Sequence, residues 1–239
     1  MNFVVENSGK LNIIFLHGWG ADHKSFLWLK DYIKHHTLHF ADLDGFGTAA
    51  EPNDITIAGY CQRLRKYVKE NGLQNVVLVG HSFGGRVAIE YASKYSIEKL
   101  VLVDAAGIKP KASLKKWWRI KKFKIAKWLS EKKIIKLAEN KYGSADYKTA
   151  SHQMKLVLKE CLTYDQTNLL KNINCPTMIV WGEKDKDTPM YMAKTMEKNI
   201  KQSKLVVLKN CGHFSFLEKP YEFYKYIDLF IENKGDKYE

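Results

Sequence analysis

A run of apolar, β-favouring residues ends in a glycine-flanked serine, and this junction constrains the fold more than any other part of the chain. Residues 76–79 read Val-Val-Leu-Val, which predicts a strand buried on both faces, as in a parallel sheet. Gly80 and Gly84 flank Ser82, and a helical pattern follows at once. Glycine is needed because a turn this sharp leaves no room for side chains on either side. The segment therefore predicts a strand–turn–helix unit that holds the Ser82 hydroxyl over the end of a sheet.

The rest of the chain alternates between strand and helix patterns. Strands are predicted over residues 3–5, 11–16, 37–41, 100–103, 177–181 and 204–208, and helices over 28–33, 54–69, from about 190 and over 220–231. This alternation predicts an α/β fold, a mostly parallel twisted sheet with helices on both faces. Reactive residues in such a sheet gather at the carboxyl ends of the strands.

Composition limits the class of protein. With 239 residues and 45% hydrophobic content, the chain can form one α/β domain with a modest insertion. It holds no apolar run near the roughly 20 residues that span a bilayer, and its first residues lack the pattern of a signal peptide. The four cysteines are scattered without a CxxC pair. We therefore expect a cytoplasmic protein without a transmembrane segment; the sequence does not predict its oligomeric state.

The segment 109–173 departs from the alternation, because it has no convincing strand and reads as several helices. Between Lys109 and Lys141 there are thirteen Lys and Arg against two Glu, so this segment carries most of the formal net charge of +13. One interpretation is that its aromatic side chains pack on the core and its lysines are solvated. A second is that Trp118 and Trp128 line an acyl pocket while the lysines attract an acidic carrier protein or an anionic surface. No motif supports nucleic-acid binding.

The junction around Ser82 resembles the nucleophile elbow of the α/β-hydrolase superfamily. The loop after the strand over 11–16, His17-Gly18-Trp19-Gly20, resembles the loop that supplies half of that superfamily's oxyanion hole. The resemblance implies that the backbone N–H groups of Trp19 and Phe83 bind the oxyanion, and that His17 and Gly18 contact substrate. It also implies a core of residues 1–108 and 174–239 with a helical cap over 109–173.

Two further segments extend the resemblance. Superfamily members often carry Gly-x-x-Asp after a late strand, and Asp185 matches the acid of that pattern. His213 lies in a Gly-His pair after the last predicted strand, where the family keeps its base, and the chain order of serine, aspartate and histidine is the family's. Asp187 and Asp104 are rival acids, although Asp187 is better explained as the cap of a helix beginning near residue 189.

The resemblance implies a carboxylesterase-like serine hydrolase that cleaves small carboxylic esters or thioesters through an acyl-enzyme. Neither a metal nor an organic cofactor is expected. Histidines at positions 35, 36 and 39 have no cysteine or carboxylate beside them in the sequence to complete a metal site.

Other functions remain open on this fold. The His-Gly-Trp-Gly loop and compact cap are also similar to enzymes that demethylate pimeloyl-carrier-protein esters, whose acidic carrier would suit a basic cap. A carbon–carbon hydrolase or lyase is a further alternative, because Gly84-Gly85-Arg86 is similar to menaquinone-pathway members, unless Arg86 is simply a surface residue. Meta-cleavage hydrolases would use the same three residues. The alternative outside enzymes is a ligand-binding protein on the hydrolase fold.

Overall fold

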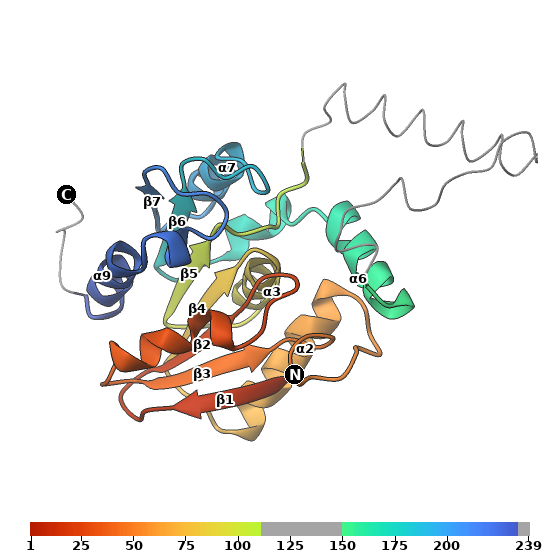
Figure 1. Cartoon of the computed structure of the whole chain (residues 1–239), viewed down its shortest axis with the longest axis horizontal. Helices are drawn as coiled ribbons and strands as arrows, with labels where there is room; N and C mark the ends of the chain where they lie inside the picture. The colour runs from red at the N-terminus through yellow and green to blue at the C-terminus, as the bar shows by residue number, and fades with distance from the viewer. Residues whose placement is uncertain (111–149, 234–239) are drawn as a thin grey trace, which may run out of the picture.

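The computed structural model describes residues 1–110 and 150–233. Its centre is one seven-stranded sheet in the order β1-β3-β2-β4-β5-β6-β7 (Figure 1). The strands are β1 (Asn2–Glu6), β2 (Asn12–Leu16), β3 (Thr37–Asp42), β4 (Val76–His81), β5 (Lys99–Val103), β6 (Thr177–Gly182) and β7 (Ser203–Leu208). β1 pairs antiparallel with β3, and every other pairing is parallel. The predicted mostly parallel sheet is confirmed.

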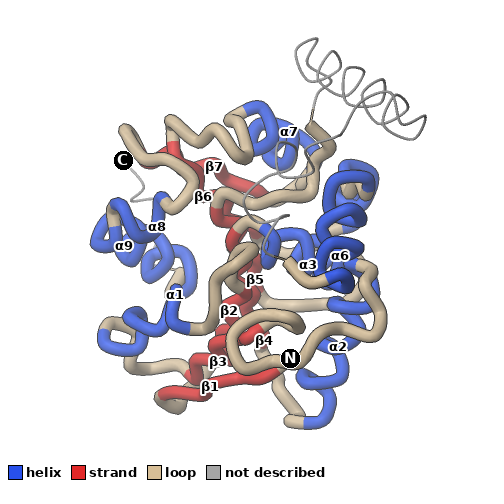
Figure 2. Tube along the Cα trace, turned by 45° about the vertical axis from the view of Figure 1, so that its right-hand side comes forward, coloured by secondary structure: helices blue, strands red, loops and turns tan. Residues whose placement is uncertain are grey.

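Helices cover both faces of this sheet (Figure 2). They are α1 (Lys24–Leu27), the 3₁₀ helix η1 (Trp28–Asp31), α2 (Ile57–Glu70), α3 (Phe83–Ala92), α6 (His152–Thr163), η3 (Thr167–Asn172), α7 (Tyr191–Asn199), α8 (Ser215–Glu218) and α9 (Pro220–Ile231). Alternate residues of each strand point to opposite faces, so Ile14 and Leu78 pack with α2, α3 and α7, whereas Ile13 and Val77 pack with α1, α8 and α9. The two apolar cores therefore follow from the period-two pattern of the strands.

One predicted helix is wrong in its extent. Residues 24–31 form two short helices, α1 and η1. Of the predicted helix over 28–33, only residues 28–31 are helical. The backbone N–H groups of Tyr32 and Ile33 both donate to the carbonyl of Leu29, at 3.1 and 2.9 Å, which closes the turn there. β3 begins soon afterwards, so the connection has no room for further helical turns.

The predicted insertion is described only in part. Residues 111–149, with Trp118 and Trp128 among them, lie outside the described residues. In the described part, α6 and η3 are helical and bury Met154 and Leu170 in the core. The Gln166 N–H donates to the carbonyl of Gly107 at 2.9 Å, so the chain re-enters the core beside the point where it left. No helix among the described residues has the length and apolar character needed to cross a membrane.

The junction at the centre of the sheet has the predicted strand–turn–helix form. Ser82 lies between β4 and α3 with φ 48° and ψ −108°. A Cβ added to Gly80 would lie 2.7 Å from the carbonyl oxygen of Gly84, and one added to Gly84 would lie 2.2 Å from that of Leu16. Real Cβ atoms essentially never come this close to a backbone oxygen, so glycine is required at both positions.

We predict that Gly84→Ala lowers the free energy of unfolding by about 3 kcal/mol, because the backbone oxygen it would meet belongs to a central strand and cannot yield. Urea denaturation would measure the change. Gly212→Ala is the matched control, since its added Cβ would meet only the flexible end of Glu218 at 3.3 Å. Equal losses for the two variants would contradict the steric explanation.

Candidate active site

Ser82 is held in its left-handed conformation by hydrogen bonds to the neighbouring strand end. Its N–H donates to the carbonyl of Val103 at 3.1 Å, and its own carbonyl accepts from Gly85 and Ala106 at 3.0 Å each. A non-glycine residue at positive φ is uncommon and persists only where its surroundings enforce it. The surrounding backbone therefore fixes the direction in which the Ser82 side chain leaves the sheet.

Three polar side chains from distant segments meet at this serine. The Oγ of Ser82 lies 2.9 Å from Nε2 of His213, and Nδ1 of His213 lies 2.8 Å from Oδ2 of Asp185. The Asp185 carboxylate also accepts from the hydroxyl of Thr188 at 2.6 Å and from the N–H of Thr188 at 3.0 Å. The structure thus brings together the three residues that the sequence singled out, in the order hydroxyl, imidazole, carboxylate.

Opposing effects set the charges in this chain of hydrogen bonds. Burial favours the neutral forms, but the hydrogen bonds from His213 and Thr188 lower the pKa of Asp185 below its ordinary value. Burial likewise lowers the pKa of His213, but the hydrogen bond to Asp185 and its negative charge outweigh burial and raise that pKa. A carboxylate beside an imidazole that gains a proton is the arrangement that makes a serine hydroxyl nucleophilic.

His81, which was not among the residues predicted from the sequence, bonds to the backbone of His213. Its Nε2 donates to the backbone carbonyl of His213 at 2.8 Å, and the two rings lie 5.0 Å apart. Burial lowers the pKa of His81 to about 3, so it stays neutral. The signal for His81 in the sequence was its position, because it places a polar ring at the end of an otherwise apolar buried strand.

Asp104 does not bond to His213, although the sequence left it as a rival acid. Its Oδ1 accepts from the N–H of Gly182 at 2.7 Å, and its Oδ2 accepts from the hydroxyl of Ser215 at 2.6 Å. Asp185 is the carboxylate in direct contact with the imidazole. Asp104 is fully buried and joins the two neighbouring loops.

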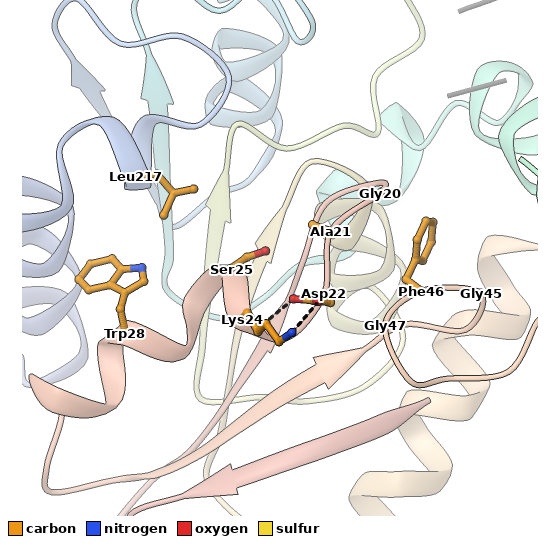
Figure 3. Close-up of a pocket in the computed structure, with 10 residues that line it drawn as sticks. All are labelled: Gly20, Ala21, Asp22, Lys24, Ser25, Trp28, Gly45, Phe46, Gly47 and Leu217. Carbon is orange, nitrogen blue, oxygen red and sulfur yellow. Dashed lines mark hydrogen bonds and ion pairs between the residues drawn. The ribbon is translucent and has the colours of Figure 1, made fainter. Parts of the chain in front are cut away.

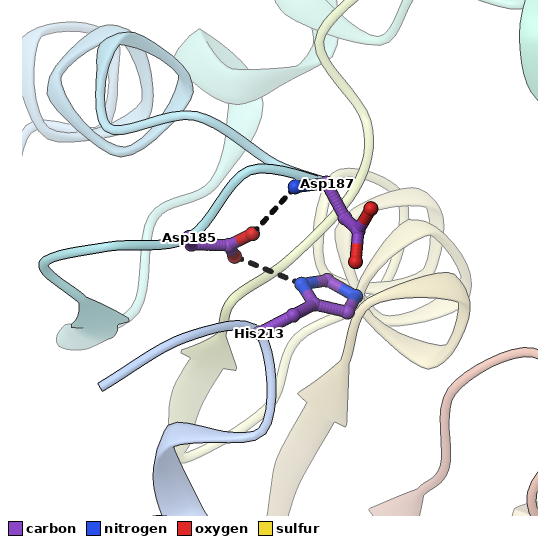
Figure 4. A group of neighbouring side chains, drawn as sticks. All are labelled: Asp185, Asp187 and His213. Atoms are coloured by element: carbon purple, nitrogen blue, oxygen red, sulfur yellow. Dashed lines mark hydrogen bonds and ion pairs between the residues drawn. The ribbon is translucent and has the colours of Figure 1, made fainter.

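The prediction that Asp187 caps the following helix is wrong. The N-cap of α7 is Met190, which makes no side-chain capping bond. Instead, the Asp187 N–H donates to Oδ1 of Asp185 at 2.8 Å, and its carboxylate lies over the ring of His213 (Figure 4). The chain turns back toward the imidazole at Asp187 before it enters the helix.

These three residues also have the spacing of a possible cation site. Donor atoms of Asp185, Asp187 and His213 lie within 4.8 Å of one another. Two of them are already bonded to each other, because Nδ1 of His213 contacts Oδ2 of Asp185. A cation would have to replace this contact, so hydrogen bonding explains the cluster without a metal.

The loop after β2 abuts the Ser82 turn. The N–H of Gly84 donates to the carbonyl of His17 at 3.0 Å, and the rings of Trp19 and Phe83 lie 5.6 Å apart. A Cβ on Gly18 would lie 2.6 Å from Nδ1 of His81, so this close approach requires glycine. The loop backbone is therefore held directly against the start of α3.

The imidazole of His17 is occupied by this loop and by the end of β3. Its Nε2 accepts from the N–H of Leu43 at 3.0 Å, so the proton is on Nδ1, which lies 2.7 Å from the carbonyl of Gly18. The residue is 1% exposed, and burial lowers its pKa. Both ring nitrogens are thus bound to backbone.

A cavity of about 630 Å³ adjoins these loops (Figure 3). One wall is formed by residues that follow Trp19 in its loop, among them Gly20 and Ala21. Another includes Leu217 from α8, the helix that follows His213. Its lining residues are Gly20, Ala21, Asp22, Lys24, Ser25, Trp28, Gly45, Phe46, Gly47 and Leu217. The lining combines apolar side chains with small residues and an ion pair at 4.0 Å between half-buried Asp22 and exposed Lys24.

Known proteins resemble the chain over most of its length. The model of the Alpha/beta hydrolase family matches residues 13–225. The AB hydrolase superfamily protein YisY of Bacillus subtilis is 28% identical over 87% of this chain and 86% of its own. The pimeloyl-acyl-carrier-protein methyl ester esterase of Wigglesworthia glossinidia brevipalpis is 26% identical over 94% and 95%. An esterase from Exiguobacterium antarcticum shares the fold, with a TM-score of 0.76, 22% identity and coverage of 96% and 95%.

The two central histidines are expected to titrate differently. NMR titration should give His213 a pKa above its ordinary value of 6.5, because Asp185 stabilises the imidazolium. His81 should stay neutral between about pH 5 and pH 8, because its ring is buried. Asp185→Asn should lower the pKa of His213. Titration of His81 within that range would contradict the described packing.

Proposed function

Because the chain belongs to the alpha/beta hydrolase family, we propose that it is a serine hydrolase in which Ser82, His213 and Asp185 act as nucleophile, base and acid. Its substrates are carboxylic esters or thioesters of small acyl groups. The observation that carries the proposal is the unbroken chain of hydrogen bonds from Ser82 Oγ to Asp185 Oδ2, with links of 2.9 and 2.8 Å.

In the proposed reaction, His213 accepts the hydroxyl proton as Ser82 Oγ attacks the acyl carbonyl. The same imidazole then gives that proton to the leaving oxygen or sulfur as its bond to the acyl carbon breaks. Water hydrolyses the resulting acyl-enzyme by the reverse sequence of proton transfers. Asp185 holds the imidazole in the required tautomer and stabilises its positive charge.

The oxyanion of the tetrahedral intermediate would be bound by the backbone N–H groups of Trp19 and Phe83. The hydrogen bond from Gly84 to His17 supports this assignment, because it holds the two backbone segments together. Donors that are already in place stabilise the developing charge without reorganisation. We assign His17 to holding the loop, since its nitrogens are bonded to backbone, and Gly18 to letting that loop pack against His81.

Similarity to a methyl ester esterase and to two lipases supports an ester substrate. The cavity beside the loop of Trp19 offers apolar contacts from Phe46, Trp28 and Leu217, which suit a small acyl or alcohol group. Burial of all four cysteines is compatible with a reducing compartment, and we propose a cytoplasmic location.

A second candidate substrate is the methyl ester of a carrier-bound acyl chain. The pimeloyl ester esterase similarity favours it, and the thirteen Lys and Arg between Lys109 and Lys141 would attract an acidic carrier protein. The interpretation of Arg86 as simply a surface residue is wrong, and its bond to backbone neither favours nor excludes the carbon–carbon hydrolase alternative. That residue is buried, not on the surface, and donates to the carbonyl of Tyr164 at 2.9 Å.

We predict that p-nitrophenyl acetate and butyrate are hydrolysed with a burst of nitrophenol, and that Ser82→Ala lowers kcat/KM by at least about 10³-fold. Stopped-flow absorbance would measure the burst, and a fluorophosphonate probe should label the wild-type protein at Ser82. Ser93→Ala is a control, because this serine bonds only the carbonyl of Glu90 in its own helix. Absence of both turnover and labelling would favour the ligand-binding alternative.

The carrier hypothesis predicts that a carrier-bound methyl ester is cleaved with a lower KM than the same ester free in solution. The difference should shrink as ionic strength rises, because salt screens attraction between the basic segment and an acidic carrier. Steady-state kinetics at low and high salt would measure it. Equal KM values at all salt concentrations would remove the carrier and leave the small-ester assignment intact.

A further inference from the structure

Asp104 has a buried carboxylate whose presence needs an explanation. Its side chain is fully buried, at the carboxyl end of β5. Burial raises its pKa to about 7, while hydrogen bonds from Ser215 and Gly182 work in the opposite direction. A buried carboxylate costs free energy unless hydrogen-bond donors satisfy it. The donors that surround Asp104 therefore indicate what it does.

These donors come from the two loops that carry the acid and the base. Gly182 ends β6 and begins the turn of Asp185, and its N–H donates to Oδ1 of Asp104 at 2.7 Å. Ser215 begins α8 directly after the His213 loop, and its hydroxyl and N–H reach Oδ2 of Asp104 at 2.6 and 3.3 Å. One side chain thus bonds both loops at once.

Thr188 strengthens the same connection. Its hydroxyl lies 3.1 Å from the backbone carbonyl of Asp104 and 2.6 Å from Oδ2 of Asp185. The end of β5 therefore contacts the Asp185 turn through backbone as well as side chain. His81 also bonds to the carbonyl of His213. The His213 loop is therefore held by His81 at His213 and by Asp104 at Ser215.

We propose that Asp104 is a positioning residue that holds the Asp185 and His213 loops at the separation the hydrogen-bond chain requires. This inference rests on the proposed hydrolase function, because it concerns the same three reacting residues. A carboxylate is the group needed, since both of its oxygens accept and three donors converge on it. An amide in its place would present N–H to one of these donors.

The charge of Asp104 also acts on the base. Asp185, Asp104 and Asp187 each favour the protonated form of His213 through negative charge, which Asp104 carries above its pKa of about 7. Asp104→Asn should therefore change two properties: the alignment of the two loops and the pKa of the imidazole. Loss of the charge alone lowers that pKa, so the fall in kcat is the measure of alignment.

The test uses Asp104→Asn in the full chain, with p-nitrophenyl butyrate as substrate. We expect kcat to fall by about 10- to 100-fold, because small misplacements of reacting groups cost this much, while KM changes less than about twofold. We also expect NMR titration to show a lower pKa for His213. Unchanged kcat would overturn the proposal whatever the pKa of His213, and so would a change in thermal stability alone.

Asp54→Asn is the matched control. The Asp54 carboxylate accepts from the N–H and hydroxyl of Thr56 at 2.9 and 2.7 Å, the same kinds of donor that Ser215 offers Asp104, but it precedes α2. Its kcat should stay within about twofold of the wild type. An equal loss in this control would show that the effect is not specific to the two loops and would overturn the proposal.

A second variant covers failure to fold. If Asp104→Asn does not fold by circular dichroism, Ser215→Ala removes one shared hydrogen bond with a smaller change. A loss of kcat of at least about fivefold at constant KM supports the proposal, and unchanged kcat overturns it. If wild-type protein is neither active nor labelled by fluorophosphonate, the hydrolase function fails, whereas the NMR resonance of the proton on Nδ1 of His213, compared between wild type and Asp104→Asn, still decides whether Asp104 holds the imidazole against Asp185.

Discussion

The close contact between the Ser82 turn and the end of β2 is the constraint on which the rest of the structure depends. Gly84 lies against the carbonyl of Leu16 with no room for a side chain, and its N–H bonds to His17. This contact places the start of α3 against β2 and brings the loop of Trp19 to the serine, while hydrogen bonds to Val103 and Ala106 hold Ser82 at positive φ. The placement of the candidate oxyanion donors therefore follows from this contact.

The parallel sheet then collects the remaining groups at one edge. Ser82 follows β4, Asp104 follows β5, the Asp185 turn follows β6 and the His213 loop follows β7. These four strands are consecutive neighbours in the sheet, so their carboxyl ends lie side by side. Each group needs only a short turn to reach the next, which is why hydrogen bonds near 2.8 Å can link residues far apart in sequence.

Local patterns predicted much of this arrangement, because they encode local physics. The glycines around Ser82 and the apolar strand runs predicted the sheet and the Ser82 turn, and the resemblance to the α/β-hydrolase superfamily implied that His213 meets Ser82. Hydrogen bonds between distant segments could not be read from the same patterns: the Ser215 hydroxyl reaches Asp104 across 111 positions. Asp187 looked like a helix cap for the same reason, since only the folded chain shows that its carboxylate lies over the imidazole.

The hydrogen bond between Gln166 and Gly107 has a consequence for how this protein can vary. The Gln166 N–H and the Gly107 carbonyl, 2.9 Å apart, join the two points at which the segment between them leaves the core and returns to it. The entropy of closing a loop rises only slowly with its length, by about 0.6 kcal/mol per doubling. A change in the number of residues between these two points would therefore cost the core little closure entropy, provided that α6, which buries Met154 in the core, is kept.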